Sequence, residues 1–190
     1  QPTNEKGTAV FGVIDVDPKQ YENFDKQFYL ETIQQYKLPL VPVESKSGGL
    51  HLYLFLNEFV QSTVIVSFLS NLLPIFNLKP DCEIFPKQTQ LTKDPETGIM
   101  KPGQFINLPY YGGQRKAINI DGTFFTLEQF IKVVDANTTN VDELKTITEE
   151  MERQSMEGVD EDFLEGPPCL ALISKISNQP TFDGKDRFMY

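Results

Sequence analysis

The sequence has few of the residues that build structural metal sites, and it has no long apolar run. Two cysteines occur in 190 residues, Cys82 and Cys169, and they form no C-x-x-C pair and no Cys/His metal spacing. This argues against a structural zinc site. No apolar run reaches the roughly 18 residues of a membrane span, and the first residues lack the basic-then-apolar layout of a signal peptide. We therefore expect an intracellular protein without a membrane partner.

Two common enzyme motifs are also absent. The chain contains no G-x-x-x-x-G-K-[ST] phosphate loop and no G-x-S-x-G elbow of a serine hydrolase. It begins with Gln1 and stops at Tyr190 just after a charged turn. From these ends we expect a piece of a longer protein.

The net charge of −10 is concentrated in one segment. Residues 135–166 carry eleven acids and two bases, whereas residues 1–134 carry fourteen acids and twelve bases. Attraction to phosphate depends on lysine and arginine, so acidity confined to one segment does not exclude a nucleic-acid partner. We expect a core domain over 1–134, an acidic helical segment or linker over 135–166, and the start of a C-terminal helical region over 167–190.

The pattern of apolar residues predicts a mixed α/β fold. Strands are predicted at 8–17, 38–45, 50–56, 81–86 and 103–109, and helices at 20–36, 60–76, 125–134, 141–154 and 169–177. The first strand is apolar nearly throughout, which is typical of a strand buried on both faces. Pro39 and Pro42 place the second strand at a sheet edge. The polar stretch 87–102 reads as a loop.

Acidic residues lie on two of these strands. Asp15 and Asp17 share one face of a strand, about 6 to 7 Å apart, and such a pair repels unless a cation lies between. Mg²⁺ and Mn²⁺ prefer oxygen ligands of this kind. A third acid comes from Glu83, or alternatively from Asp81 at the mouth of the strand. Solvated acids at strand ends are the other interpretation of both groups.

The stretch SKSGGLHLYLF, residues 45–55, holds the single histidine of the chain. Its hydroxyls, its ammonium group and its flexible backbone N–H groups can cradle phosphate oxygens. His51 is placed to bond a phosphate or a sugar, although a lone histidine on a strand is more often structural.

Taken together, FGVIDVD, SKSGGLHLYLF, CEIFPKQ and GQFINLPYYGG resemble the catalytic core of the archaeo-eukaryotic primase superfamily. The likeness is to primase-polymerases of phages, plasmids and conflict systems, and it covers about residues 10–113. The resemblance implies a sheet like that of an RNA-recognition motif beside a smaller α/β module, followed by C-terminal helices. It also implies a phage- or plasmid-encoded protein that acts in the host cytoplasm, with further domains such as a helicase.

The resemblance assigns roles to individual residues. It implies that Asp15, Asp17 and Glu83 (or Asp81) hold two Mg²⁺ or Mn²⁺ ions, with His51 in the catalytic set. It implies that nucleotide binding involves Ser45, Lys46, Ser47, Gly48, His51, Lys87, Gln88, Asn107 and Tyr110. Tyr110 and Tyr111 either stack on a base or sugar or belong to the core.

The implied activity is template-directed nucleotidyl transfer, as a DNA primase, a DNA polymerase or both. Two metals would activate a 3′-hydroxyl and stabilise the leaving pyrophosphate. The partners would be a single-stranded or primed DNA template and dNTPs or NTPs. A DNA- or origin-binding module without catalysis and a metal-dependent phosphodiesterase or nuclease are the alternatives.

Overall fold

The computed structural model of the protein describes residues 2–156. The expected helix at 169–177 and the expected C-terminal region 167–190 lie outside the described residues, as does the end of the acidic segment. The chain divides into two compact units, Gln1–Val141 and the part that begins at Asp142. The predicted α/β class is confirmed for the first unit.

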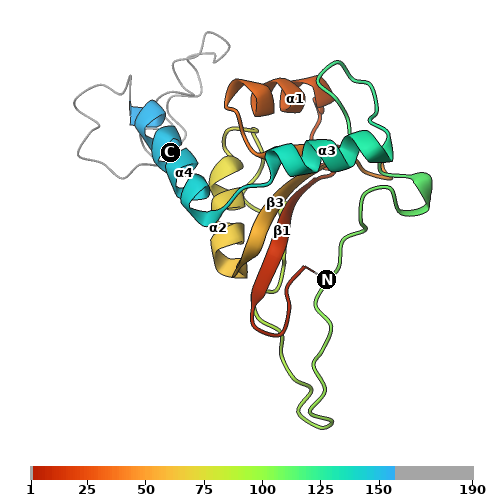
Figure 1. Ribbon diagram of the computed structural model, residues 1–190, viewed down its shortest axis with the longest axis vertical. Coiled ribbons are helices and arrows are strands. Elements are labelled where there is room, and N and C mark those ends of the chain that lie inside the picture. The colour runs from red at the N-terminus through yellow and green to blue at the C-terminus, as the bar shows by residue number, and fades with distance from the viewer. Residues whose placement is uncertain (1, 157–190) are drawn as a thin grey trace. The chain divides into compact units, whose positions relative to one another are not determined.

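The first unit is built on a four-stranded sheet with the order β2-β3-β1-β4, in which all neighbours are antiparallel (Figure 1). Its strands are β1 (Thr8–Val16), β2 (Leu40–Glu44), β3 (Leu50–Gln61) and β4 (Glu83–Phe85). Helix α1 (Lys26–Gln35) connects β1 to β2, and α2 (Ser62–Leu72) connects β3 to β4. The buried character of the first strand and the edge position of the second are as expected from the sequence.

Helices α1 and α2 cover one face of the sheet. Helix α2 packs closely against Gly12, where an added Cβ would lie 2.4 Å from the side chain of Ile65 and 2.8 Å from that of Leu69. Tyr29 of α1 stacks on Phe76, which follows α2, with ring centroids 5.8 Å apart. Glycine at position 12 therefore allows the helix to approach the central strand directly.

The opposite face carries a second apolar cluster. Val13, Val41, Val43, Tyr53, Phe85 and Ala117 are its buried members. Helix α3 (Leu127–Asn137), which crosses in front of β1 and β3 in Figure 1, contributes Phe130, Val133 and Val134. Thr126 and Gln129 form a capping box at the start of α3, which satisfies the free N–H groups of its first turn. The sheet and α3 therefore enclose this apolar cluster, which lies beside the polar ends of β1 and β3.

The predicted strand at 103–109 is wrong. Residues 101–108 have no regular structure, and a short 3-10 helix, η2 (Tyr111–Gly113), follows. Pro109 cannot donate a ladder hydrogen bond, and Tyr110 has a left-handed backbone (φ 59°), so the chain turns here instead of continuing along the sheet. The segment is held by separate anchors, since Ile106 and Tyr110 pack against the apolar cluster.

The smaller α/β module is not present as a second sheet within residues 2–156. Beyond β4 the backbone makes only isolated bridges, such as Lys93 with Met100 and Ile118 with Phe124. The bridge between Val43 and Ala117 covers the free edge of β2.

The helix predicted at 20–36 begins later than expected. A 3-10 turn, η1 (Pro18–Gln20), follows β1, and α1 starts at Lys26 because the Asp25 carboxylate caps it by accepting from the Gln27 N–H at 3.0 Å. Strand β3 also extends past the predicted residue 56. Its last residues, Val60 and Gln61, pair with Ala9 and Thr8 of β1 beyond a register shift, and Leu56 bridges to Thr139.

The second unit is described through α4 (Val141–Met156). Asp142 and Glu143 lie in its first turn, where negative charge is favourable near the positive end of the helix dipole. Of the helices in residues 2–156, none has both the length and the apolarity needed to span a membrane.

Candidate active site

One row of paired residues contains three of the four predicted catalytic residues. Asp15 of β1 pairs with His51 of β3 on one side and with Glu83 of β4 on the other. Residues directly opposite one another in an antiparallel sheet project from the same face. We call His51, Asp15 and Glu83 the polar row. Three sequence motifs that are far apart in the chain meet in it.

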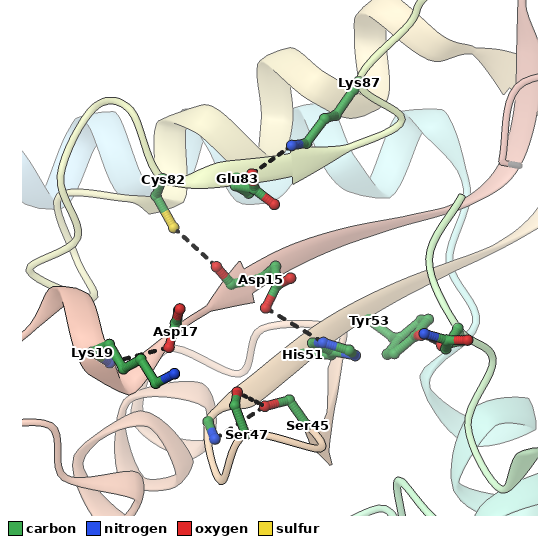
Figure 2. A network of polar contacts seen from close by, with 12 residues as sticks. Asp15, Asp17, Lys19, Ser45, Ser47, His51, Tyr53, Cys82, Glu83 and Lys87 are labelled. Atoms are coloured by element: carbon green, nitrogen blue, oxygen red, sulfur yellow. Dashed lines mark hydrogen bonds and ion pairs between the residues drawn. The ribbon is translucent and has the colours of Figure 1, made fainter. Parts of the chain in front are cut away.

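The polar row runs from a buried end to an open one. The exposed fraction of the side chain is 9% for His51, 28% for Asp15 and 47% for Glu83. Figure 2 shows Asp15 between the other two, with its carboxylate turned toward the imidazole at 3.3 Å from Nε2. The other imidazole nitrogen, Nδ1, is buried and has no hydrogen-bond partner. An unpaired buried nitrogen is costly to the fold, which is a pattern typical of a functional position.

Asp17 lies just past the end of β1, two residues after Asp15. Its carboxylate accepts a hydrogen bond of 3.1 Å from the Lys19 N–H and caps η1. The two acids therefore have different partners, as Figure 2 shows.

The loop SKSGG connects β2 to β3 and lies against the end of β1. A Cβ on Gly49 would lie 2.2 Å from the Val16 carbonyl oxygen and 2.6 Å from Cδ of Pro18. Only glycine permits this approach, since real Cβ atoms essentially never come so close to another heavy atom. The loop and the acidic end of β1 are thus fixed next to each other.

Within the loop, the predicted phosphate-binding residues divide into two groups. Ser45 is buried, and its Oγ accepts from the Gly49 N–H at 3.0 Å and lies 2.9 Å from Oγ of Ser47. Lys46 and Ser47 are exposed, and Gly48 has a positive φ of 86°. Ser45 therefore shapes the loop, while Lys46 and Ser47 are accessible to a ligand.

The two candidates for the third acid differ in position. Glu83 opens β4 and pairs with Asp15, whereas Asp81 is exposed and lies in the turn before the strand. The Glu83 carboxylate forms an ion pair with Lys87 at 2.5 Å. The placement favours Glu83 over Asp81 as the neighbour of Asp15.

The remaining predicted nucleotide-binding residues, Gln88, Asn107 and Tyr110, take part in hydrogen bonds that hold the chain after β4. The Gln88 amide oxygen accepts from the Gln104 N–H at 2.7 Å, and the Asn107 carbonyl accepts from the Tyr53 hydroxyl at 2.8 Å. The Tyr110 hydroxyl donates to the Phe125 carbonyl at 2.6 Å, and its ring lies 5.0 Å from that of Phe130. Tyr110 therefore belongs to the packed core, whereas Tyr111 is 73% exposed.

Two further residues border the polar row and were not predicted. Burial raises the pKa of the Tyr53 hydroxyl, which stays protonated at neutral pH and donates to Asn107. Burial also raises the pKa of the Cys82 thiol, which donates to the Asp15 carbonyl. Both are supports rather than nucleophiles, because a protonated thiol or phenol reacts slowly.

Sequence reasoning also missed Arg115. It is near enough to Tyr53 to influence the pKa of its hydroxyl, and the carbonyl of the next residue, Lys116, accepts from the Glu44 N–H beside the SKSGG loop. The available signal was GGQRK (residues 112–116), in which two adjacent bases follow two glycines and a glutamine. These two basic residues therefore lie close to the strands that carry the polar row.

The acids suit a divalent cation by type and by strand position. Asp15 and Glu83 come from directly paired residues, and their oxygens are the donors that Mg²⁺ and Mn²⁺ prefer. Their side chains, however, face His51 and Lys87, and within residues 2–156 no three His, Cys, Asp or Glu side chains converge as a metal site. Ion binding therefore requires Glu83 to exchange its partner. Such an exposed ion pair contributes at most about 1 kcal/mol, so the exchange costs little.

A cavity of about 640 Å³ lies elsewhere, between α1, the loop before it and the residues after α2. Rings of Tyr21, Phe28, Tyr29 and Phe76 line it. It contains none of the residues that the sequence predicted for the site.

No model of a protein family matches the chain, and no curated protein is significantly similar to it.

Proposed function

We propose that this protein is a template-directed nucleotidyltransferase, a DNA primase and/or DNA polymerase that adds nucleotides to a 3′-hydroxyl. The observation that carries the proposal is the polar row beside the SKSGG loop. It combines carboxylates for cations with lysine and hydroxyl groups for phosphates, and the two groups of residues are fixed by the contact of Gly49 with β1.

The order of the elements also supports a primase-type fold. The sequence β1-α1-β2-β3-α2-β4 and the sheet order β2-β3-β1-β4 are those of the split βαβ arrangement that the RNA-recognition motif uses. In that arrangement the helices cover one face, and the polar row projects from the other.

The roles follow from chemistry. Asp15, Asp17 and Glu83 would hold the divalent cations, which supply charge stabilisation for phosphoryl transfer when bound. Lys46 and Ser47 would bind the triphosphate, and Lys87, released from Glu83, would neutralise developing charge. His51 would orient Asp15 and bond the nucleotide. DNA template and nucleoside triphosphates are the partners that this site requires.

The test is incubation of the 190-residue chain with Mn²⁺ or Mg²⁺, a primed DNA template and labelled nucleotides. We expect extension, and we expect the variant Asp15→Ala/Asp17→Ala to lose more than about 100-fold, the upper end of the loss seen for groups that merely support metal ligands. Glu83→Ala should behave in the same way. Asp81→Ala is the matched control and should retain activity.

Other outcomes point to the alternatives. Extension that survives the Asp15→Ala/Asp17→Ala change contradicts the metal assignment. Degradation of single strands without nucleotides would identify a nuclease, and DNA binding without incorporation in either metal would identify a binding module.

A further inference from the structure

Residues 87–116, which we call the basic segment, differ in charge from the rest of the chain. They contain five bases and two acids, in a protein whose net charge is −10. The bases are Lys87, Lys93, Lys101, Arg115 and Lys116. The acids, Asp94 and Glu96, lie at the tip of a turn, where the Asp94 carboxylate caps Glu96 and Thr97. Lys87 and Lys101 form ion pairs with Glu83 and Asp94, so the positive charge open to a polyanion rests on Lys93, Arg115 and Lys116.

The basic segment also presents aromatic rings to solvent. Phe105 is 74% exposed and Tyr111 is 73% exposed. Leaving such rings in water forgoes the favourable burial of a large apolar side chain. A single exposed ring needs no explanation, whereas two exposed rings in one positively charged segment suit stacking on the flat faces of nucleic-acid bases.

The exposure of these rings is fixed by their neighbours. Ile106 and Tyr110 pack inward against the apolar cluster of the sheet, and the Tyr110 hydroxyl is bonded to Phe125. Left-handed backbone at Tyr110, together with Gly112 and Gly113 at φ 63° and 73°, turns the chain where Tyr111 stands. Ile106 and Tyr110 thus anchor the segment, and their neighbours Phe105 and Tyr111 stay exposed.

The basic segment is tied to the face that carries the polar row. The Asn107 carbonyl accepts from Tyr53, which neighbours His51 along β3, and Gln104 is bonded to Gln88 after β4. In Figure 1 the first part of the segment, coloured yellow-green to green, runs away from the sheet and returns to it. A ligand on the rings would therefore lie beside the candidate active site.

We propose that the basic segment binds single-stranded nucleic acid, with Phe105 and Tyr111 stacking on bases and the lysines contacting phosphates. Charge complementarity selects this occupant, because a polyanion with exposed base faces matches both the cations and the rings. The inference rests on the proposed function in one respect only: the bound strand would be the template for transfer at the polar row.

The test measures binding of a fluorescent oligothymidylate to the full 190-residue chain. Fluorescence anisotropy is the readout, in EDTA and without nucleotides. Phe105→Ala/Tyr111→Ala should weaken binding by about 5-fold or more for each ring, the loss typical of a stacked base. Phe105→Tyr/Tyr111→Phe keeps the rings and should bind like the wild type. Phe59→Ala is the matched control, because Phe59 is 66% exposed on β3 outside the basic segment.

The charges are tested by salt dependence. Lys93→Gln and Lys116→Gln should each lower the slope of log Kd against log salt by about 0.7, the value for one phosphate contact on a single strand. Thermal melting of every variant checks the fold, which should be unchanged since the substituted side chains are exposed.

Three results would overturn the inference. One is binding by the double alanine variant within about twofold of the wild type, well short of the loss of a stacked base, and another is an equal loss in Phe59→Ala. The third is self-association that disappears with the rings, which would assign the surface to a second copy of the chain. The proposed function is tested separately, because Asp15→Ala/Asp17→Ala should still bind the oligonucleotide. If the wild type binds single strands without extending them, the nucleic-acid-binding surface is supported and the proposed nucleotidyltransferase activity is contradicted.

Discussion

Two neighbouring rows on one face of the sheet have opposite properties. The polar row contains His51, Asp15 and Glu83, and the row two residues along contains Val41, Tyr53, Val13 and Phe85. Every member of the second row, the apolar row, is at most 6% exposed. The polar row opens to 47% exposure at Glu83. A buried apolar row and a partly exposed polar row thus lie only two residues apart on one face of the sheet.

The difference has a physical basis in the partners of each row. The apolar row is covered by α3 and by Ile106 and Tyr110, so its side chains lose water and gain packing. The polar row has weak, exchangeable contacts: a carboxylate 3.3 Å from an imidazole, and an exposed ion pair of Glu83 with Lys87. A ligand can replace such weak contacts at little cost in free energy, so a row of this kind is suited to bind one. Substitutions in or beside the two rows test this separation, because their expected costs in stability differ widely.

Tyr53→Ala should cause the largest loss of stability. Removal of a fully buried aromatic ring costs about 3–5 kcal/mol, and the Asn107 carbonyl would lose its donor as well. Urea unfolding measures the change. Tyr53→Phe is the control, since it keeps the ring, loses only the hydrogen bond and should cost about 1 kcal/mol. Equal costs for the two variants would contradict the apolar row as the source of stability.

Gly49→Ala should come next, at about 1–3 kcal/mol, because the new Cβ would overlap the Val16 carbonyl oxygen. The loop must then move away from β1, so the KM for nucleotide should rise as stability falls. Gly122→Ala supplies the control: this residue has a positive φ of 80° but nothing within 4 Å of an added Cβ. An unchanged KM in Gly49→Ala would show that the loop does not bind the nucleotide.

His51→Ala should have the smallest effect on stability and a large effect on nucleotide use. Its ring contact with Tyr53 is lost, but so is an unpaired buried nitrogen, and the two changes oppose each other to within about 1 kcal/mol. Val43→Ala changes the residue paired with His51 and should do the reverse, at about 2 kcal/mol with activity kept. For both variants, melting curves measure the change in stability and extension rates measure the change in activity.

Local patterns predicted the parts of this fold that local chemistry determines. The apolar run of β1 and the prolines of β2 indicated a central and an edge strand, and the sheet order has both. The helix start was misplaced because the capping by Asp25, rather than the apolar spacing from Tyr21, sets where α1 begins.

Long-range pairing could not be predicted from the residues alone. The register that sets Asp15 opposite both His51 and Glu83 joins residues far apart in the chain, and it follows from how the strands pack. The strand expected at 103–109 failed for a related reason. Of its apolar residues, Ile106 packs against the cluster around Tyr53 while Phe105 and Leu108 are exposed, and Pro109 and Tyr110 turn the chain before a ladder can form. Arg115 was overlooked because a base in a glycine-rich turn has no periodic pattern.

The single histidine of the chain has a practical consequence for spectroscopy. Because His51 occupies the polar row and the chain has no other imidazole, its NMR signals need no assignment. They form a native, label-free reporter located 3.3 Å from the Asp15 carboxylate. Titration with a diamagnetic ion should shift these signals, and a paramagnetic ion such as Mn²⁺ should broaden them, so occupancy beside Asp15 can be observed before any turnover is measured.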